Sequence, residues 1–193
     1  MVNGIILAGG NSTRMGTDKS LLLLAGKTLT EWTYKAIAPV ISRCIIVSNN
    51  PENTIPNCET IPDIVKGIGP IGGIYSGLKH SNSEHNLVVS CDTPFLETIV
   101  LKRLWAEHIS GSLVVSANSG QTQPLIGYYS RNLLEKIERK ISDKNYKLFD
   151  LINKEHAKIV NFDSQTPYTF MNMNTPEDFA LAIEIEKRLH KTG

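Results

Sequence analysis

Short apolar runs alternate with segments of helical periodicity along most of the chain. Runs of four to six residues that are rich in Ile, Val and Leu predict β-strands. These predicted strands are residues 4–8, 44–48, 58–61, 86–91, 112–117, 125–129 and 158–162. Strands that alternate with helices are typical of an α/β fold, in which a parallel or mostly parallel sheet is flanked by helices.

Start and stop signals support the predicted helices. Thr28 and Glu31 form a capping-box sequence, which predicts a helix that runs to about Ala38 and stops at Pro39. Thr175-Pro176 predicts the start of the last helix, because Thr is a good N-cap and Pro suits the first helical position. Apolar spacing predicts further helices at residues 71–80, 100–108, 131–141 and 147–153.

Length and charge narrow the class of protein. A chain of 193 residues is long enough for one α/β domain with a sizeable core and short for two, and we find no repeat or linker that would divide residues 1–193. A net charge of +1 argues against a nucleic-acid-binding surface. No apolar run approaches a membrane span, and the first residues lack the basic region of a signal peptide. We therefore expect a cytoplasmic protein without membrane or nucleic-acid partners.

The cysteines do not indicate a metal or redox site. Cys44, Cys58 and Cys91 are odd in number and lack the close paired spacing of structural zinc sites and redox motifs. We interpret all three as reduced core residues. Cys91 precedes an aspartate at a strand end, but a strand residue that points away from its neighbour usually packs inward, so a catalytic thiol is not expected.

The candidate chemistry begins directly after the first predicted strand. The chain continues there as Leu7-Ala8-Gly9-Gly10-Asn11-Ser12-Thr13-Arg14-Met15-Gly16-Thr17-Asp18-Lys19. Glycines allow backbone N–H groups to approach a polyphosphate, and Arg14 and Lys19 supply positive charge to its oxygens. The spacing excludes a P-loop, because Thr17 follows Gly16 where that motif requires lysine. The loop therefore predicts a nucleoside triphosphate site.

This loop resembles the signature of nucleotidyltransferases and, with Asp18-Lys19 after Arg-Met-Gly, that of molybdenum cofactor guanylyltransferases. Three further segments are similar to the same family and come in the same order: residues 69–74, 91–96 and 172–178. The resemblance implies a single-domain, Rossmann-like, three-layer α/β/α nucleotidyltransferase fold with a mostly parallel, mixed sheet. It also implies a nucleotide-binding half at about residues 1–100 and an acceptor-binding half at 101–193.

The resemblance also implies site residues. Leu7, Ala8, Gly9 and Gly10 correspond to the nucleotide-binding start of the loop, and Arg14, Lys19 and Asp92 to the catalytic groups.

Two aspartates follow predicted strands. Asp92 follows the strand at 86–91, on the sheet edge that also carries the loop, and the resemblance assigns it the Mg²⁺ ion, a cation that prefers carboxylate and phosphate oxygens. Capping of the next helix is the alternative for Asp92. Asp63 matches a family aspartate that contacts the nucleotide, although a turn residue at this position is an equal alternative.

The implied reaction transfers GMP from GTP to the terminal phosphate of molybdopterin or its metal-loaded form, with release of pyrophosphate. A phosphate nucleophile is anionic near neutral pH, which fits the lack of an obvious general base. Asn172 and Asn174 match family asparagines that face the acceptor, although asparagine before a helix is also an ordinary cap. Contacts with molybdenum cofactor chaperones or molybdoenzymes would be transient.

Two alternatives stay open. Another nucleotidyltransferase could use CTP on molybdopterin or act on a small phosphorylated acceptor. A non-catalytic adaptor could bind GTP or pterin and release no pyrophosphate.

Overall fold

The computed structural model describes residues 1–9, 18–109, 111–163 and 168–191. The strands are β1 (Val2–Leu7), β2 (Leu23–Leu24), β3 (Lys27–Thr28), β4 (Arg43–Val47), β5 (Cys58–Ile61), β6 (His85–Ser90), β7 (Leu113–Asn118), β8 (Gln121–Ser130) and β9 (Lys158–Asn161). The α-helices are α1 (Leu29–Ile37), α2 (Pro70–His80), α3 (Thr98–Ala106), α4 (Leu134–Ser142), α5 (Leu148–Lys154) and α6 (Pro176–Lys191). Short 3₁₀ turns are η1 (Lys19–Leu21), η2 (Ala38–Val40) and η3 (Arg131–Leu133).

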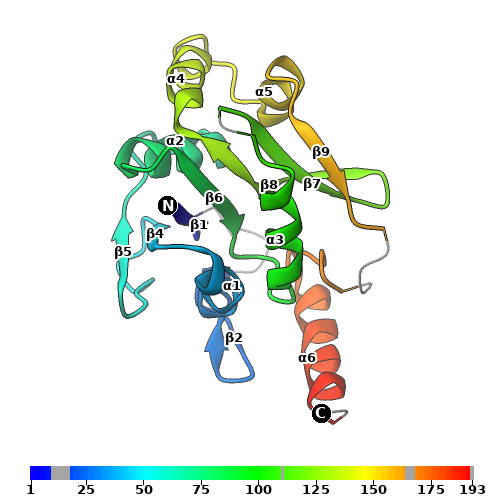
Figure 1. Cartoon of the computed structure of the whole chain (residues 1–193). Helices are drawn as coiled ribbons and strands as arrows, with labels where there is room; N and C mark the ends of the chain where they lie inside the picture. Colours follow the sequence, from blue (N-terminus) through cyan, green and yellow to red (C-terminus); the bar gives the residue numbers. More distant parts are fainter. Residues whose placement is uncertain (10–17, 110, 164–167, 192–193) are drawn as a thin grey trace.

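Across the described ranges the main sheet has seven strands in the order β5-β4-β1-β6-β8-β7-β9. Strands β5, β4, β1 and β6 are mutually parallel, β8 runs antiparallel to both neighbours, and β9 is parallel to β7. Figure 1 shows β1 and β6 at the centre of this sheet. The predicted α/β fold with a mostly parallel, mixed sheet is therefore confirmed.

Helices cover both faces of the sheet and create two separate cores. On one face α1 and α3 contribute Ile37, Val100 and Leu104 to a cluster with Ile6 and Val89 of the sheet. The other core contains apolar side chains of α2, α4 and α5 against the opposite side chains of the same strands. This alternation of strand residues between two buried faces explains the continuous apolar runs in the sequence.

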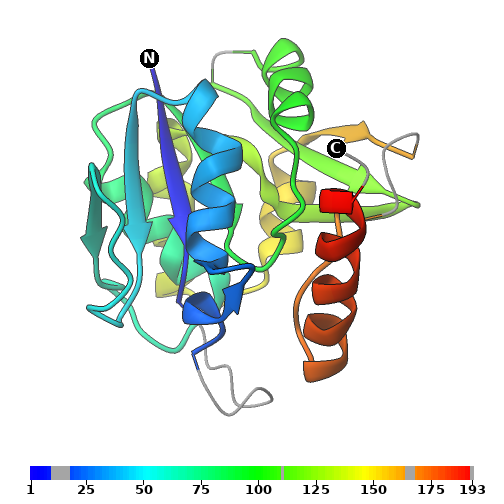
Figure 2. The same ribbon diagram turned by 90° about the horizontal axis from the view of Figure 1, so that it is seen from below.

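The last helix stands apart from these layers. α6 projects below the sheet in Figure 1, and Figure 2 shows the same helix from below, in red. Its residue Ala182 packs with Leu24 of β2, Leu29 of α1 and Met173 in a third, smaller cluster. Among the described residues, no helix is both long and apolar enough to cross a membrane.

Local signals and observed boundaries agree for most elements, but β8 begins at Gln121, four residues before the predicted start. The capping box is present, since Thr28 Oγ1 accepts from Glu31 N at 3.1 Å and Glu31 Oε2 accepts from Thr28 N at 2.6 Å. The hairpin formed by β2 and β3 was not predicted, because each strand has only two residues. Cys58 is a free thiol as predicted, but it is only partly buried and packs against the margin of the core.

Candidate functional site

The carboxyl ends of three adjacent parallel strands form the floor of the site. Beyond the end of β1, Ala8 N donates to Val47 O of β4 at 3.0 Å, and Cys91 N after β6 donates to Leu7 O at 3.1 Å. These bonds hold the chain after each strand at the same sheet edge. Ligands of open α/β sheets bind outside this edge.

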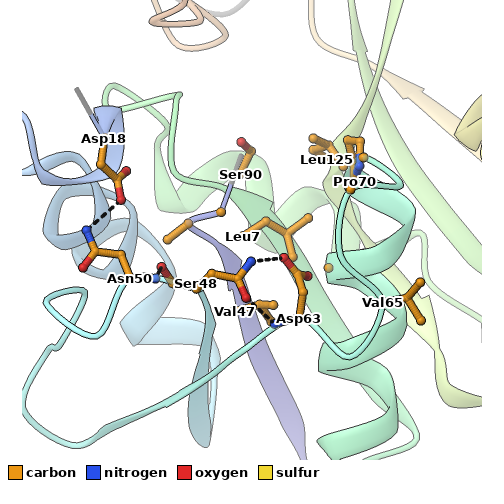
Figure 3. A pocket seen from close by; sticks show the side chains of 16 residues that line it. Leu7, Asp18, Val47, Ser48, Asn50, Asp63, Val65, Pro70, Ser90 and Leu125 are labelled. Carbon is orange, nitrogen blue, oxygen red and sulfur yellow. Dashed lines mark hydrogen bonds between the residues drawn. The ribbon is translucent and has the colours of Figure 1, made fainter. Parts of the chain in front are cut away.

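A cavity of about 600 Å³ opens above this edge. Leu7, Ala8 and Gly9 line it from β1, and Asp63 and Gly69 line it from the segment between β5 and α2. Figure 3 shows the labelled side chains of Leu7, Asp63 and other lining residues around the space. The predicted start of the nucleotide loop and the predicted nucleotide aspartate therefore lie in one cavity.

Two glycines, Gly69 and Gly73, line the side of the cavity that α2 forms. Gly69 has φ +73°, a backbone conformation that an L side chain rarely adopts, and it is the N-cap of α2. A Cβ atom on Gly73, one turn into the helix, would lie 3.1 Å from a Leu7 methyl group. Gly73 therefore lets α2 pack closely against Leu7 of β1, and both glycines line the cavity with backbone atoms.

Lys19, Asp92 and Asn174 converge beside the same strand ends. Lys19 Nζ lies 3.0 Å from Asp92 Oδ2 and donates to Asn174 Oδ1 at 3.1 Å. The side chains of Lys19 and Asp92 are 21% and 16% exposed, so the ion pair is reachable by a ligand without being a surface pair. Three residues from remote parts of the chain therefore meet at one point.

The main chain fixes this meeting point. Met173 N donates to Asp92 O at 2.8 Å, which ties the segment before α6 to the turn after β6. Asp178 Oδ2 then accepts from Asn174 N and Thr175 N, each at 2.9 Å. These bonds lower the pKa of the Asp178 carboxyl, with the Asn174 N–H as the largest cause. Asn172 lies in the same segment and is partly exposed.

Asp63 is held by an asparagine that was not singled out in the sequence. Asn49 Nδ2 donates to Asp63 Oδ2 at 2.9 Å, and Asp63 N donates to Asn49 Oδ1 at 3.3 Å. Burial raises the pKa of the Asp63 carboxyl, while the Asn49 hydrogen bond and the charge of Lys66 oppose that change. The carboxylate is thus oriented before a ligand arrives, as the dashed lines in Figure 3 show.

A second asparagine holds the neighbour of Lys19. Asn50 Nδ2 donates to Asp18 Oδ2 at 2.9 Å, also drawn in Figure 3. Asp18 Oδ1 accepts from Ser20 N at 3.1 Å and caps the short turn η1. The signal for both asparagines was their place directly after a predicted strand, which is also common for ordinary turn residues.

Two predicted groups, Arg14 and Gly10, lie outside the described residues. Cys91 is 3% exposed, and burial raises its pKa to about 12, so the thiol is packed as predicted and poorly suited to nucleophilic chemistry.

The carboxylate oxygen atoms of the site are compatible with Mg²⁺ but do not by themselves complete its coordination. In the part of the chain that the structure describes, no three His, Cys, Asp or Glu residues gather as a metal site. Mg²⁺ is usually held by one or two carboxylates together with substrate phosphates and water. Asp92, a partly exposed carboxylate at the sheet edge that also carries the cavity, would supply the carboxylate oxygen of such a site.

Comparisons with known proteins identify relatives of this chain in sequence and in fold. Residues 4–159 match the family described as the MobA-like NTP transferase domain. A probable molybdenum cofactor guanylyltransferase of Flavobacterium johnsoniae is 35% identical, over 90% of this chain and 92% of the relative. The molybdenum cofactor guanylyltransferase of Vibrio parahaemolyticus is 31% identical, over 94% and 95% of the two chains. The crystal structure of molybdopterin-guanine dinucleotide biosynthesis protein A from Archaeoglobus fulgidus superimposes with a TM-score of 0.77 at 26% identity, over 96% and 99% of the chains.

Proposed function

The chain belongs to the family of MobA-like NTP transferase domains, and from that premise we propose that it transfers GMP from GTP to the terminal phosphate of molybdopterin or its metal-loaded form. Pyrophosphate is the second product. The observation that carries the proposal is the contact of Lys19 with Asp92 at 3.0 Å, beside a cavity of about 600 Å³ that Leu7, Ala8, Gly9 and Asp63 line.

In this proposal the first half of the chain binds GTP. Leu7, Ala8, Gly9 and Gly10 bring backbone groups to the phosphates, and Asp63 contacts the nucleoside within the cavity. The oriented carboxylate of Asp63 supports this role, because an ionised carboxylate accepts hydrogen bonds from nucleoside N–H or O–H groups.

The charged groups serve the transfer itself. Lys19, together with Arg14, balances the negative charge of the triphosphate and of the departing pyrophosphate. Asp92 holds Mg²⁺, which when bound supplies positive charge to the phosphate oxygens. The acceptor phosphate is already anionic, so alignment and charge neutralisation replace a general base.

The acceptor approaches from the second half of the chain, with Asn172 and Asn174 as its polar contacts. The hydrogen bond from Lys19 to Asn174 supports a boundary between the two substrates at this point. The division at about residue 100 is not strict, because Leu125 of β8 also lines the cavity.

One assay tests the proposed reaction. Purified protein is incubated with Mg²⁺, molybdopterin and either GTP or CTP, and the dinucleotide product is identified by mass while pyrophosphate is measured. The expected product is the guanine dinucleotide. A cytosine dinucleotide, or tight binding without pyrophosphate release, would contradict the proposal.

A matched pair of lysine variants tests the site. Lys19→Ala is expected to lower kcat/KM by about a hundredfold, because loss of one group that stabilises developing charge costs about 3 kcal/mol. Lys27→Ala is the control, since Lys27 lies in β3 over the Trp32 ring, 5.8 Å from its centroid. Equal defects would show that general basicity matters and not the position of Lys19.

We place the activity in the cytoplasm, where GTP is available. Transient contacts with molybdenum cofactor chaperones or molybdoenzymes, which would pass on the pterin, stay a prediction. Copurification of the finished cofactor with a recipient enzyme would test them.

A further inference from the structure

The loop after β4 contacts two different walls of the site. Residues 48–53 read Ser-Asn-Asn-Pro-Glu-Asn, and all three asparagines use their side chains. Asn49 bonds Asp63, Asn50 bonds Asp18, and Asn53 bonds Ser20. This short loop therefore holds Asp63 of the cavity wall with its first asparagine. The other two asparagines hold Asp18 and Ser20, the residues on either side of Lys19.

Lys19 is fixed through its sequence neighbours. Asp18 precedes it and accepts from Asn50 Nδ2 at 2.9 Å. Ser20 follows it, and Ser20 Oγ accepts from Asn53 Nδ2 at 2.7 Å. Asp18 and Ser20 are also joined, since Ser20 Oγ donates to Asp18 Oδ1 at 2.5 Å. The backbone that carries the Lys19 side chain is thus held on both sides.

The Asn53 side chain, which bonds Ser20, is buried and makes three hydrogen bonds. Asn53 is 2% exposed; it also donates to Ser48 Oγ at 3.0 Å and accepts from Thr30 Oγ1 at 3.1 Å. A buried polar network with satisfied partners specifies one geometry, because any shift would leave a group without its hydrogen bond. Asn50, by contrast, is partly exposed and can be changed without opening the core.

We propose that Asn50 is a positioning residue that acts on catalysis through Asp18 and Lys19. The Asn50 amide holds the Asp18 carboxylate, Asp18 caps η1, and η1 begins with Lys19. Asn50 therefore sets where the Lys19 ammonium meets the triphosphate. This inference rests on the proposed nucleotide site and adds a residue that the sequence motifs did not indicate.

A double-mutant cycle on nucleotide affinity tests the proposal. The dissociation constant of GTP with Mg²⁺ is measured by calorimetry, without pterin, for the wild type, Asn50→Ala, Lys19→Ala and the double variant. We expect Asn50→Ala to weaken GTP binding about fivefold, the usual range for loss of the hydrogen bond that holds Asp18. The second bond of this side chain, which Asn50 Oδ1 accepts from Glu52 N at 3.0 Å, stays within the loop. In the Lys19→Ala background the same change should cost less than twofold, because residues that act in series are not additive.

Asn49→Ala is the matched control, since Asn49 is the adjacent residue of the same type but holds Asp63. Its effect on GTP affinity should be the same in the wild-type and Lys19→Ala backgrounds. A melting temperature for each variant checks the fold; a general structural defect would lower it and would reduce affinity equally in both backgrounds.

The outcomes separate this inference from the proposed function. An Asn50→Ala effect that persists in full when Lys19 is absent would overturn the positioning role and place Asn50 in direct contact with the nucleotide or in the fold. Non-additivity in GTP binding, together with no guanylylation of molybdopterin by the wild type, would support the positioning role and contradict the proposed reaction.

Discussion

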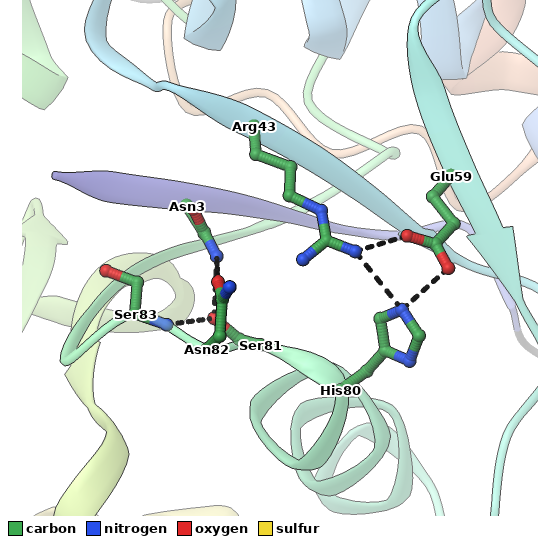
Figure 4. A network of polar contacts seen from close by, with 7 residues as sticks. All are labelled: Asn3, Arg43, Glu59, His80, Ser81, Asn82 and Ser83. Atoms are coloured by element: carbon green, nitrogen blue, oxygen red, sulfur yellow. Dashed lines mark hydrogen bonds and ion pairs between the residues drawn. The ribbon is translucent and has the colours of Figure 1, made fainter.

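Two polar clusters lie at opposite edges of the same sheet. The carboxyl-edge cluster consists of Lys19, Asp92 and Asn174. The amino-edge cluster consists of Arg43, Glu59 and His80, where Arg43 Nη2 bonds Glu59 Oε2 and His80 Nε2 lies 2.7 Å from Glu59 Oε1. Figure 4 shows this second cluster beside the polar contacts of Asn3 with Ser81 and Asn82.

Each cluster contains a cation beside a carboxylate, so the ion pair alone does not distinguish them. Their surroundings do. Side chains of Arg43 and Glu59 are 38% and 45% exposed, against only 21% and 16% for Lys19 and Asp92. The carboxyl-edge cluster adjoins the cavity walls and joins three remote parts of the chain. The ion pair of Lys19 and Asp92 indicates a functional site because it lies at strand ends, beside a cavity, and joins distant segments of the chain.

The strongest test of this contrast removes the carboxylate at the carboxyl edge. Asp92→Ala is expected to lower kcat by about a hundredfold or more, because one lost charge-stabilising group costs about 3 kcal/mol. The fold should persist, because Lys19 keeps its hydrogen bond to Asn174 and both side chains stay partly reachable by water. Initial rates at saturating Mg²⁺ and thermal melts measure the two effects. Near-normal activity at unchanged stability would exclude Asp92 as the metal ligand.

A smaller effect is expected for the third member of the same cluster. Asn174→Ala should impair guanylylation of molybdopterin, while GTP affinity measured without pterin falls by less than tenfold, about 1.4 kcal/mol. Asn174 Oδ1 accepts one exposed hydrogen bond from Lys19 Nζ, and the other polar atoms of the Asn174 amide are available to the acceptor. A larger loss of GTP affinity would assign Asn174 to the nucleotide site and would remove the boundary between the substrates.

The helix start that supports Asn174 gives a third test. Asp178→Ala should cost about 1 kcal/mol of unfolding free energy at pH 7, the usual value for a lost helix cap. Because the folded-state pKa of Asp178 is lowered, its contribution is present above the unfolded pKa of about 3.9 and is lost as the pH falls through the folded pKa. Urea titrations at pH 7 and pH 3 should show the difference from wild type shrinking. A difference that is constant with pH would mean that the carboxylate charge is not involved.

The smallest effect is expected at the amino edge. Glu59→Gln should leave kcat/KM within about twofold and reduce stability by less than about 1 kcal/mol, because exposed ion pairs are screened by water. The Arg43 hydrogen bond is the largest cause of the lowered pKa of Glu59, so this small contribution too is present near neutral pH and disappears in acid. A tenfold loss of activity would show that the two clusters are coupled across the sheet.

Strands and helices could be predicted because their signals are local. β5 spans Cys58–Ile61, the predicted range, and β1, β4, β6 and β7 are each shifted by only one or two residues. Buried parallel strands are apolar on both faces, which makes their runs conspicuous. The β2–β3 hairpin has two residues in each strand and leaves no such pattern.

The site was only partly visible in the sequence. Motif residues such as Lys19 and Asp92 stood out through the resemblance, and the structure brings them together. The asparagines that orient Asp18 and Asp63 did not stand out, because asparagine after a strand is equally typical of a turn. Their role depends on which side chain lies opposite, and that is set by the packing of β4, β5 and η1, not by spacing along the chain.

The contact between Lys19 and Asn174 joins residues 155 positions apart, and it has a consequence for synthesis. A ribosome that has released the first hundred residues has delivered Lys19, Asp63 and Asp92, which can already settle around the parallel strands as they pair. Asn174 emerges much later, and with it the main-chain bond from Met173 to Asp92. A nascent chain can therefore gather most of the cavity lining before β8 adds Leu125, and the meeting point of Lys19, Asp92 and Asn174 forms only after the segment before α6 has emerged.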